Sequence, residues 1–237
     1  MAVVGAIGQS VIVKPRKVVY KRTAKNVPEF KRTFEVEYPV FSGKLSPSTL
    51  RALKTGTDYW RIFDISLAEN LKSEHWLSSL GYDVKYNNHN ILDILLFIEG
   101  VGAYPDGSSR FLVFDLRTGK KLTYADLFTA ANMRGMVSKI RTVMQRNEED
   151  AIKENAETRE RLAYYRDAYP EVHKLPSAID LKDLDGFSIS DTGVTFMYGY
   201  NFAHVEQALE PSGEFFLSYQ ELKPFVRTDG LLARFVR

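Results

Sequence analysis

The sequence predicts an α+β protein in which an antiparallel sheet has helices packed on one face and carries a long charged helical insertion. Apolar and charged residues alternate over 34–38 and 82–86, the period of two that half-buried strands show. Apolar positions between Leu127 and Met144 recur at the spacing of a helix face. Residues 147–168 carry eleven charges in twenty-two residues, which favours an exposed helix.

Two helices are predicted in the first third of the chain. Ser46 before Pro47 is typical of a helix start, and Gly56 is a suitable end. Ser66 and Glu69 fit a capping box, so a second helix is expected from Ser66 to Gly81. Before them, 11–13 and 18–20 are predicted strands, with Pro15 marking an edge or a break.

The middle and the end of the chain predict hairpins. Strands are expected over 82–86 and 91–98, joined by a polar turn, and over 110–116 after a polar loop at 100–109. Gly119 suits a left-handed turn position. Helical sequence fills 123–169 and ends at Pro170. A last hairpin pairs 186–190 with 194–202, and a short helix begins at Ser218.

These elements suggest three parts. Residues 1–32 form a basic β arm, 33–81 a small module, and 82–237 the main α+β domain with its helical insertion at 123–169. The arm holds eight basic residues and one acid, a net charge of +7, which leaves −5 for the rest of a chain of net charge +2. Such an arm could contact an anionic polymer such as nucleic acid, teichoic acid or lipid head groups. The simpler interpretation, which we favour, is a solvated edge strand that resists aggregation.

Composition and motifs exclude several kinds of chemistry. The chain has no cysteine, so it has no disulfide and no thiol nucleophile. Its longest apolar run, 91–98, is too short to span a bilayer, and its first eight residues do not form a signal peptide. The chain has four scattered histidines: His75, His89, His173 and His204. Because their spacing does not suit a shared metal ion, we expect no metal site and no cofactor.

The acidic residues that could suggest a catalytic or calcium site are each explained by a structural role. Residues 180–186 superficially resemble a calcium loop, but Leu181 and Lys182 upset the ligand spacing, and we expect an ordinary loop. Asp115 is expected to bond the turn that follows it, and Asp126 lies at a helix start. No pair of nucleophile and base can be identified.

Aromatic residues are the candidate binding residues. Tyr104, Tyr198, Tyr200 and Phe202, together with His204, could form a face for a glycan or a peptide, because aromatic rings stack on sugars and anchor interfaces. Alternation places Tyr198, Tyr200 and Phe202 on one side of the predicted strand. Ordinary core packing of that side is the simpler alternative.

Four runs carry a resemblance to a known family: Tyr86–Ile94, Gly100–Pro105, Phe114–Lys120 and Tyr124–Phe128. In outline, 33–226 is similar to a bacterial domain family of unknown function. That domain forms the C-terminal part of lysozyme-binding anti-sigma-factor ectodomains and accompanies some peptidoglycan deacetylases. The family often has histidine where this chain has Tyr104. The deacetylase chemistry belongs to a separate metal-dependent domain whose motifs are absent here.

The resemblance implies a non-enzymatic binding or sensing domain in the cell envelope, periplasmic or secreted. Its ligand would be a protein such as a lytic enzyme, or a cell-wall glycan, and we expect no nucleic-acid partner. One alternative is a hydrolase acting on cell-wall material through Asp115, Tyr104 and His204. Another is a protein-interaction domain that uses the charged helix at 147–168.

Overall fold

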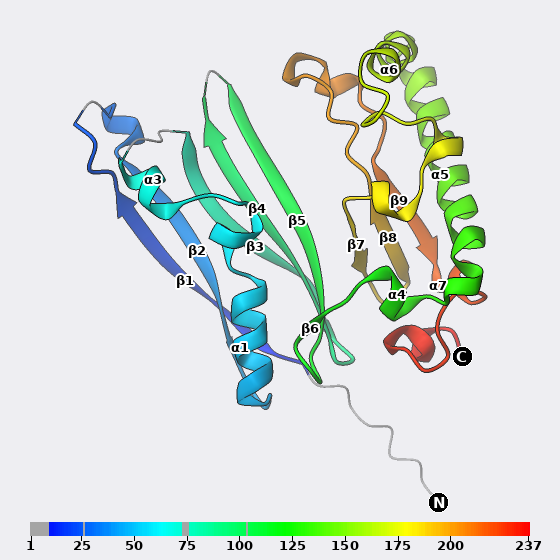
Figure 1. Ribbon diagram of the computed structural model, residues 1–237, viewed down its shortest axis with the longest axis horizontal. Coiled ribbons are helices and arrows are strands. Elements are labelled where there is room, and N and C mark those ends of the chain that lie inside the picture. The colour runs from blue at the N-terminus through cyan, green and yellow to red at the C-terminus, as the bar shows by residue number, and fades with distance from the viewer. Residues whose placement is uncertain (1–9, 26, 73–75, 103) are drawn as a thin grey trace, which may run out of the picture. The chain divides into compact units, whose positions relative to one another are not determined.

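The computed structural model describes residues 10–25, 27–72, 76–102 and 104–237. His75 and the first nine residues, on which some sequence predictions fall, lie outside the described residues. The chain folds as two compact units, Met1–Leu122 and Thr123–Arg237 (Figure 1). This division falls at neither of the boundaries, after residue 32 and after residue 81, predicted from the sequence.

The described strands of the first unit form one sheet in chain order. They are β1 (Ile12–Lys21), β2 (Thr33–Ser42), β3 (Leu77–Asn88), β4 (Ile91–Val101), β5 (Pro105–Asp115) and β6 (Lys120–Lys121). Neighbouring strands are antiparallel except β2 and β3, which pair in parallel at Val36 and Leu80. The sheet is therefore mixed rather than antiparallel, because the connection from β2 to β3 crosses over through helices.

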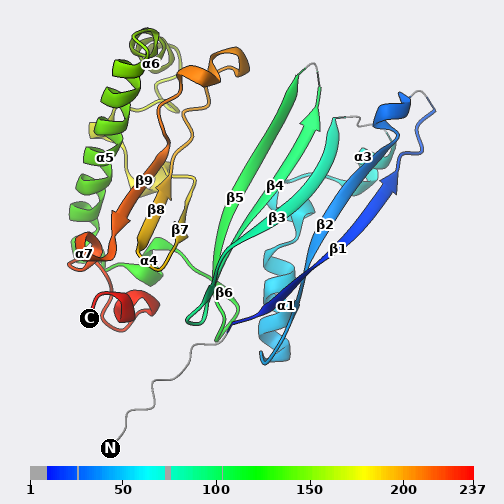
Figure 2. The same cartoon turned by 180° about the vertical axis from the view of Figure 1, so that it is seen from behind.

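Three helices cover one face of this sheet: α1 (Pro47–Gly56), α2 (Tyr59–Ile62) and α3 (Leu67–Lys72) (Figures 1 and 2). The Ser46 side chain caps α1 by accepting a 3.0 Å hydrogen bond from the Thr49 amide. Between helices and sheet lies a core of fully buried side chains that includes Val36, Leu53, Tyr59 and Leu96. A short 3₁₀ turn, Glu29–Lys31, joins β1 to β2.

The second unit packs helices against a small antiparallel sheet of β7 (Gly186–Ile189), β8 (Gly193–Met197) and β9 (Glu214–Ser218). Its helices are α4 (Tyr124–Leu127), α5 (Met133–Glu154), α6 (Glu157–Ala168) and α7 (Tyr219–Leu222). The predicted face of α5 is buried at Met136, Val137, Ile140 and Met144. The Asn147 side chain fixes α5 to β9 by donating to the Glu214 carbonyl at 3.1 Å.

The α+β class is confirmed, as are several local predictions. The helix at 47–56 has the predicted bounds. Strands β3 and β4 form the predicted hairpin, with His89 and Asn90 in left-handed conformation at its turn. Gly119 has φ +77° in the turn after β5. Strand β1 lies at the edge of the sheet, where Pro15 was expected to mark an edge.

The helix predicted over 66–81 is wrong in its second half. The described helix ends at Lys72, and β3 begins at Leu77. Gly81 lies inside β3 rather than after a helix. A Cβ atom there would come within 2.5 Å of the Phe97 ring on β4, so this glycine permits close packing between strands and does not stop a helix.

Three further boundaries differ from the prediction. The polar loop over 100–109 is largely strand, because β4 and β5 extend their hairpin as far as Val101 and Pro105. The strand expected over 194–202 ends at Met197. The charged helical segment breaks at Asn155, and its second half buries Leu162 and Tyr165.

None of the helices in the described part of the chain has the length and apolar character that crossing a bilayer requires.

A buried arginine holds one end of the first unit together. Arg22, which is 2% exposed, donates to the carbonyl groups of Lys31, Leu77, Thr33 (3.3 Å) and Asn70 (3.1 Å). Its guanidinium also lies 4.8 Å from the centre of the Phe34 ring. These acceptors come from the β1–β2 connection, β2, α3 and β3, so one side chain joins segments far apart in the sequence.

We expect Arg22→Met to lower the free energy of unfolding of the first unit by about 3 kcal/mol, because it leaves buried carbonyl groups without their charged donor. Both tryptophans, Trp60 and Trp76, belong to this unit, so urea unfolding followed by tryptophan fluorescence reports on it. Lys21→Ala, on the exposed end of β1, is the control and should change stability by less than about 0.5 kcal/mol. Equal effects of the two changes would contradict this role of Arg22.

Candidate functional site

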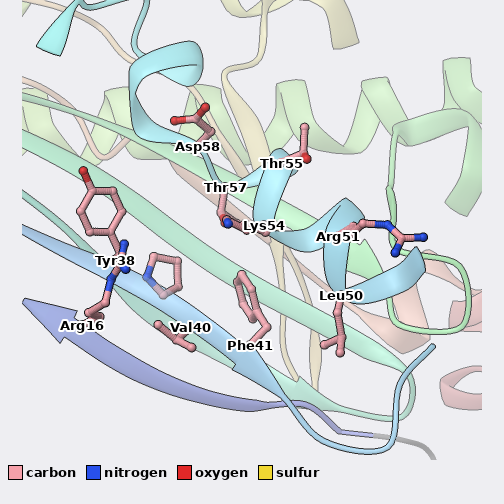
Figure 3. A pocket seen from close by; sticks show the side chains of 11 residues that line it. Arg16, Tyr38, Val40, Phe41, Leu50, Arg51, Lys54, Thr55, Thr57 and Asp58 are labelled. Carbon is pink, nitrogen blue, oxygen red and sulfur yellow. The ribbon is translucent and has the colours of Figure 1, made fainter. Parts of the chain in front are cut away.

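The first unit contains a groove between helix α1 and strands β1 and β2, with a volume of about 700 Å³ (Figure 3). We call it the α1 groove. Figure 3 shows Arg16 and Tyr38 at one end and Leu50 and Arg51 at the other, with Phe41 between them. Its apolar lining is Tyr38, Pro39, Val40, Phe41 and Leu50, and its polar lining is Arg16, Arg51, Lys54, Thr55, Thr57 and Asp58.

The groove exists because α1 is anchored to the sheet along its other side. Leu53 is fully buried beneath the helix. Gly56 allows close approach, because a Cβ atom there would lie 2.7 Å from the Phe114 ring of β5. After α1, the Tyr59 hydroxyl donates to the Glu37 carbonyl of β2 at 2.7 Å, and the Thr57 hydroxyl donates to the Leu53 carbonyl at 2.9 Å.

Tyr38 forms the floor at one end of the groove. The Arg16 guanidinium lies 5.2 Å from the centre of its ring, a cation–π arrangement that holds Arg16 in place. Its hydroxyl is hydrogen bonded to that of Tyr20 at 2.9 Å. Burial, followed by this hydrogen bond, raises the pKa of Tyr38 to about 12. The phenol therefore stays neutral at physiological pH and adds no negative charge to the groove.

The charge of the groove is positive. Arg16, Arg51 and Lys54 form no ion pair with a carboxylate among the described residues, and Asp58 is the one acidic residue in the lining. The Asp58 side chain already accepts a 3.3 Å hydrogen bond from the Trp60 amide as the cap of α2. The whole first unit carries 18 basic and 12 acidic residues, a net charge of +6. The groove is thus suited to an anionic group.

A second hollow, of about 560 Å³, lies on the β5 and β6 side of α1. Arg51 and Thr55 line both hollows. Two further cations, Arg61 and Lys121, line the second one, and no acidic residue does. Its apolar lining includes Phe114. We call it the β5 hollow.

The predicted aromatic residues of the second unit lie together but are buried. Tyr198, Tyr200 and Phe202 follow β8 instead of extending it, and they are 6%, 3% and 4% exposed. Their ring centres are 5.0 Å apart for Tyr198 and Tyr200 and 6.2 Å for Tyr200 and Phe202. The prediction that they share one side of a strand is wrong, and no ring face of the three is open to a ligand in this conformation.

These rings cover an ion pair between the two long helices. Glu148 of α5 pairs with Arg166 of α6, and the Tyr200 hydroxyl donates to the same carboxylate oxygen at 3.1 Å. Burial, and then the Glu148 charge, raise the pKa of Tyr200 above its usual range. Phe202 stacks on Tyr165 of α6 at 4.4 Å between ring centres. The cluster therefore ties the segment after β8 to both helices.

The other two predicted binding residues are exposed. Tyr104, in the β4–β5 turn of the first unit, is 62% exposed. His204, at the start of a 3₁₀ turn (His204–Leu209), belongs to the second unit. Neither unit by itself brings Tyr104 and His204 together, so a shared binding role for them stays a prediction.

Residues considered for chemistry have structural roles. Asp115 accepts from the Arg117 amide at 2.9 Å and forms a 2.8 Å ion pair with the Arg117 side chain, as its predicted turn role requires. In the calcium-like loop, Asp183 accepts from Lys174 at 2.7 Å and Asp185 accepts from the Gly199 amide at 2.6 Å. The described residues contain no cluster of three or more potential metal ligands.

The sequence matches no protein-family model and no curated protein. Its fold is similar to two solved structures of proteins of the DUF3298 family, a family of unknown function. One, from Pseudomonas aeruginosa PAO1, has a TM-score of 0.60 and 13% identity over 92% of this chain and 95% of its own. The other, from Bacteroides fragilis, has a TM-score of 0.60 and 13% identity over 98% of both chains. At this identity the likeness establishes the fold alone.

Sequence reasoning missed the α1 groove. Its cations come from two distant segments, Arg16 on β1 and Arg51 with Lys54 on α1. One signal was present, because residues three apart on a helix are neighbours and no acid lies between positions 50 and 57. The basic N-terminal arm supplies the other cation, Arg16. The charge of the arm does not indicate that it pairs with β2.

We expect Tyr200→Ala to lower the free energy of unfolding of the second unit by about 3 to 5 kcal/mol, because it removes a buried ring and a hydrogen bond to Glu148. Urea unfolding followed by the helical circular-dichroism signal measures this loss. Tyr104→Ala is the matched control and should cost less than about 0.5 kcal/mol. If Tyr200→Ala were no more harmful than Tyr104→Ala, the structural role of this cluster would be wrong.

Proposed function

We propose that this chain is a non-enzymatic binding domain, and that the α1 groove holds an anionic group of its ligand. The observation that carries the proposal is the set of three cations, Arg16, Arg51 and Lys54, around an apolar floor without carboxylate partners. Guanidinium and ammonium groups are the side chains that bind carboxylates and phosphates in proteins.

Two features make the groove ready for such a ligand. Arg16 rests on the Tyr38 ring, so less side-chain entropy is lost when it binds. The apolar floor of Val40, Phe41 and Leu50 excludes water from one side of the bound group, which strengthens its attraction to the cations. The ligand that fits best is anionic and has an apolar or sugar-like body.

The cell envelope is the proposed location, with a cell-wall glycan as the proposed ligand class. This part of the proposal rests on the resemblance carried by Tyr86–Ile94 and Phe114–Lys120. The groove chemistry supports it because cell walls contain acidic glycans. A lytic enzyme as ligand is the other candidate from the resemblance, and it would have to present an acidic segment to the same cations.

The hydrolase alternative gains no support from the site. Asp115 accepts hydrogen bonds from both the amide and the side chain of Arg117. This carboxylate is therefore bonded to its own turn. In the α1 groove, the Thr57 hydroxyl donates to the Leu53 carbonyl and the Asp58 carboxylate accepts from the Trp60 amide, so both have structural partners.

We expect the double variant Arg16→Ala, Lys54→Ala to bind acidic wall glycan about tenfold more weakly than the unaltered chain, since two cation contacts are lost. Sedimentation with purified cell walls measures the binding, and walls stripped of their anionic polymers give the background. The match for charge is the double variant Lys25→Ala, Lys72→Ala, which removes two basic residues that do not line the groove. The proposal fails if both double variants bind acidic walls equally well.

A further inference from the structure

The α1 groove and the β5 hollow lie on opposite sides of a single helix, α1. Arg51 and Thr55 line both, and residues four apart on a helix lie one above the other on the same face. Arg51 is therefore a cation that a ligand occupying both hollows would meet in each of them. We call the two hollows, with the Arg51 and Thr55 side chains that they share, the path across α1.

Cations line the whole of this path. Arg16 and Lys54 lie on the first side, Arg51 in the middle, and Arg61 and Lys121 on the second side. In the part of the chain that the structure describes, none of the five forms an ion pair. A single small anion would use only part of this path, whereas a chain of regularly repeated negative charges would use all of it.

We propose that the path binds a linear polymer of sugar or polyol units joined by phosphodiesters, which crosses α1 and occupies both hollows. The proposal rests on the proposed function and names its ligand. A phosphodiester bears one negative charge per repeat and two free oxygens that accept hydrogen bonds. Arginine binds such oxygens with two parallel hydrogen bonds, and three of the five cations are arginines.

The hydrogen-bonding groups that line the path favour this ligand over an acidic peptide. A peptide carries one backbone N–H per residue that needs an acceptor. The lining mostly donates: its one carboxylate, Asp58, already caps α2, and Thr57 donates to the Leu53 carbonyl. The phosphodiester groups bring only acceptors and so satisfy this lining, and the hydroxyl donors of such a polymer belong to the sugar or polyol units between them.

The arrangement of the aromatic rings along the path argues against single-stranded nucleic acid as the ligand. Such ligands stack successive bases on open aromatic faces. Here the Tyr38 ring is covered by Arg16 and packs 5.9 Å from the ring of Tyr59, and Phe41 is half-buried against the core. The lining therefore offers one partly open ring, Phe41, and not the series of open faces that successive bases need, whereas a polyol or sugar needs only the apolar floor.

The test uses the full chain and synthetic glycerol-phosphate oligomers, with binding measured by titration calorimetry. One oligomer is short enough to stay in the α1 groove, and one is long enough to cross α1. The long oligomer should bind about a hundredfold more tightly, because its second set of contacts forms within the same complex. Lys54→Ala should weaken both oligomers about threefold, whereas Arg61→Ala should weaken only the long one by about the same factor.

Arg51→Ala should weaken both oligomers, and Lys72→Ala, outside both hollows, should weaken neither. The salt dependence of long-oligomer binding should also become shallower by about one unit of slope for each cation removed from the path. Neutral polyglycerol of the same length should not bind, which separates charge from polymer length.

Two sets of results would overturn the inference. If the long oligomer binds no better than the short one and Arg61→Ala has no effect, the ligand does not cross α1, although binding in the α1 groove stands. If neither oligomer binds, or Lys54→Ala changes nothing, the proposed function falls with it. Tighter binding of an acidic peptide, single-stranded DNA or anionic lipid vesicles at the same cations would overturn the choice of ligand.

Discussion

The close contact between α1 and the sheet at Gly56 is the constraint on which the candidate site depends. A side chain at this position would meet the Phe114 ring, so only glycine lets the helix lie low on the sheet. Leu53 is buried by the same approach. The helix thereby divides the covered face of the sheet, with the α1 groove on its β1–β2 side and the β5 hollow on its β5–β6 side.

The charged residues of the first unit are also divided between the two hollows and the rest of the unit. In the first unit, several acidic residues are neutralised away from the hollows: Lys17 pairs with Glu35 and Glu37, and Arg117 pairs with Asp115. The cations along α1 are left without partners of this kind among the described residues. The second unit has 14 basic and 18 acidic residues, a net charge of −4, and its best-buried ion pair, Glu148 with Arg166, joins its own helices. The net positive charge, on which the proposed attraction for anions rests, therefore belongs to the first unit.

Local features of the fold were predictable because nearby residues determine them. The Ser46 cap and the Gly119 turn depend on a few neighbouring atoms, and both were found where the sequence predicted them. Gly81 misled the prediction, because its small size serves packing against Phe97 on another strand. The candidate site could not be predicted from the sequence for the same reason, because Arg16 comes near α1 only when β1 has paired with β2. In the second unit, the alternation of residues does not distinguish a buried Tyr200 from one on the surface.

The proposed binding surface of this chain lies along α1 and not in the aromatic cluster of the second unit. Backbone amide chemical shifts, followed by NMR while the glycerol-phosphate oligomer is added to the full chain, test it most directly. We expect the largest changes on the segments that line the α1 groove, around residues 16, 38–41 and 50–58. Changes concentrated instead at 198–204, with the α1 segments unmoved, would contradict it.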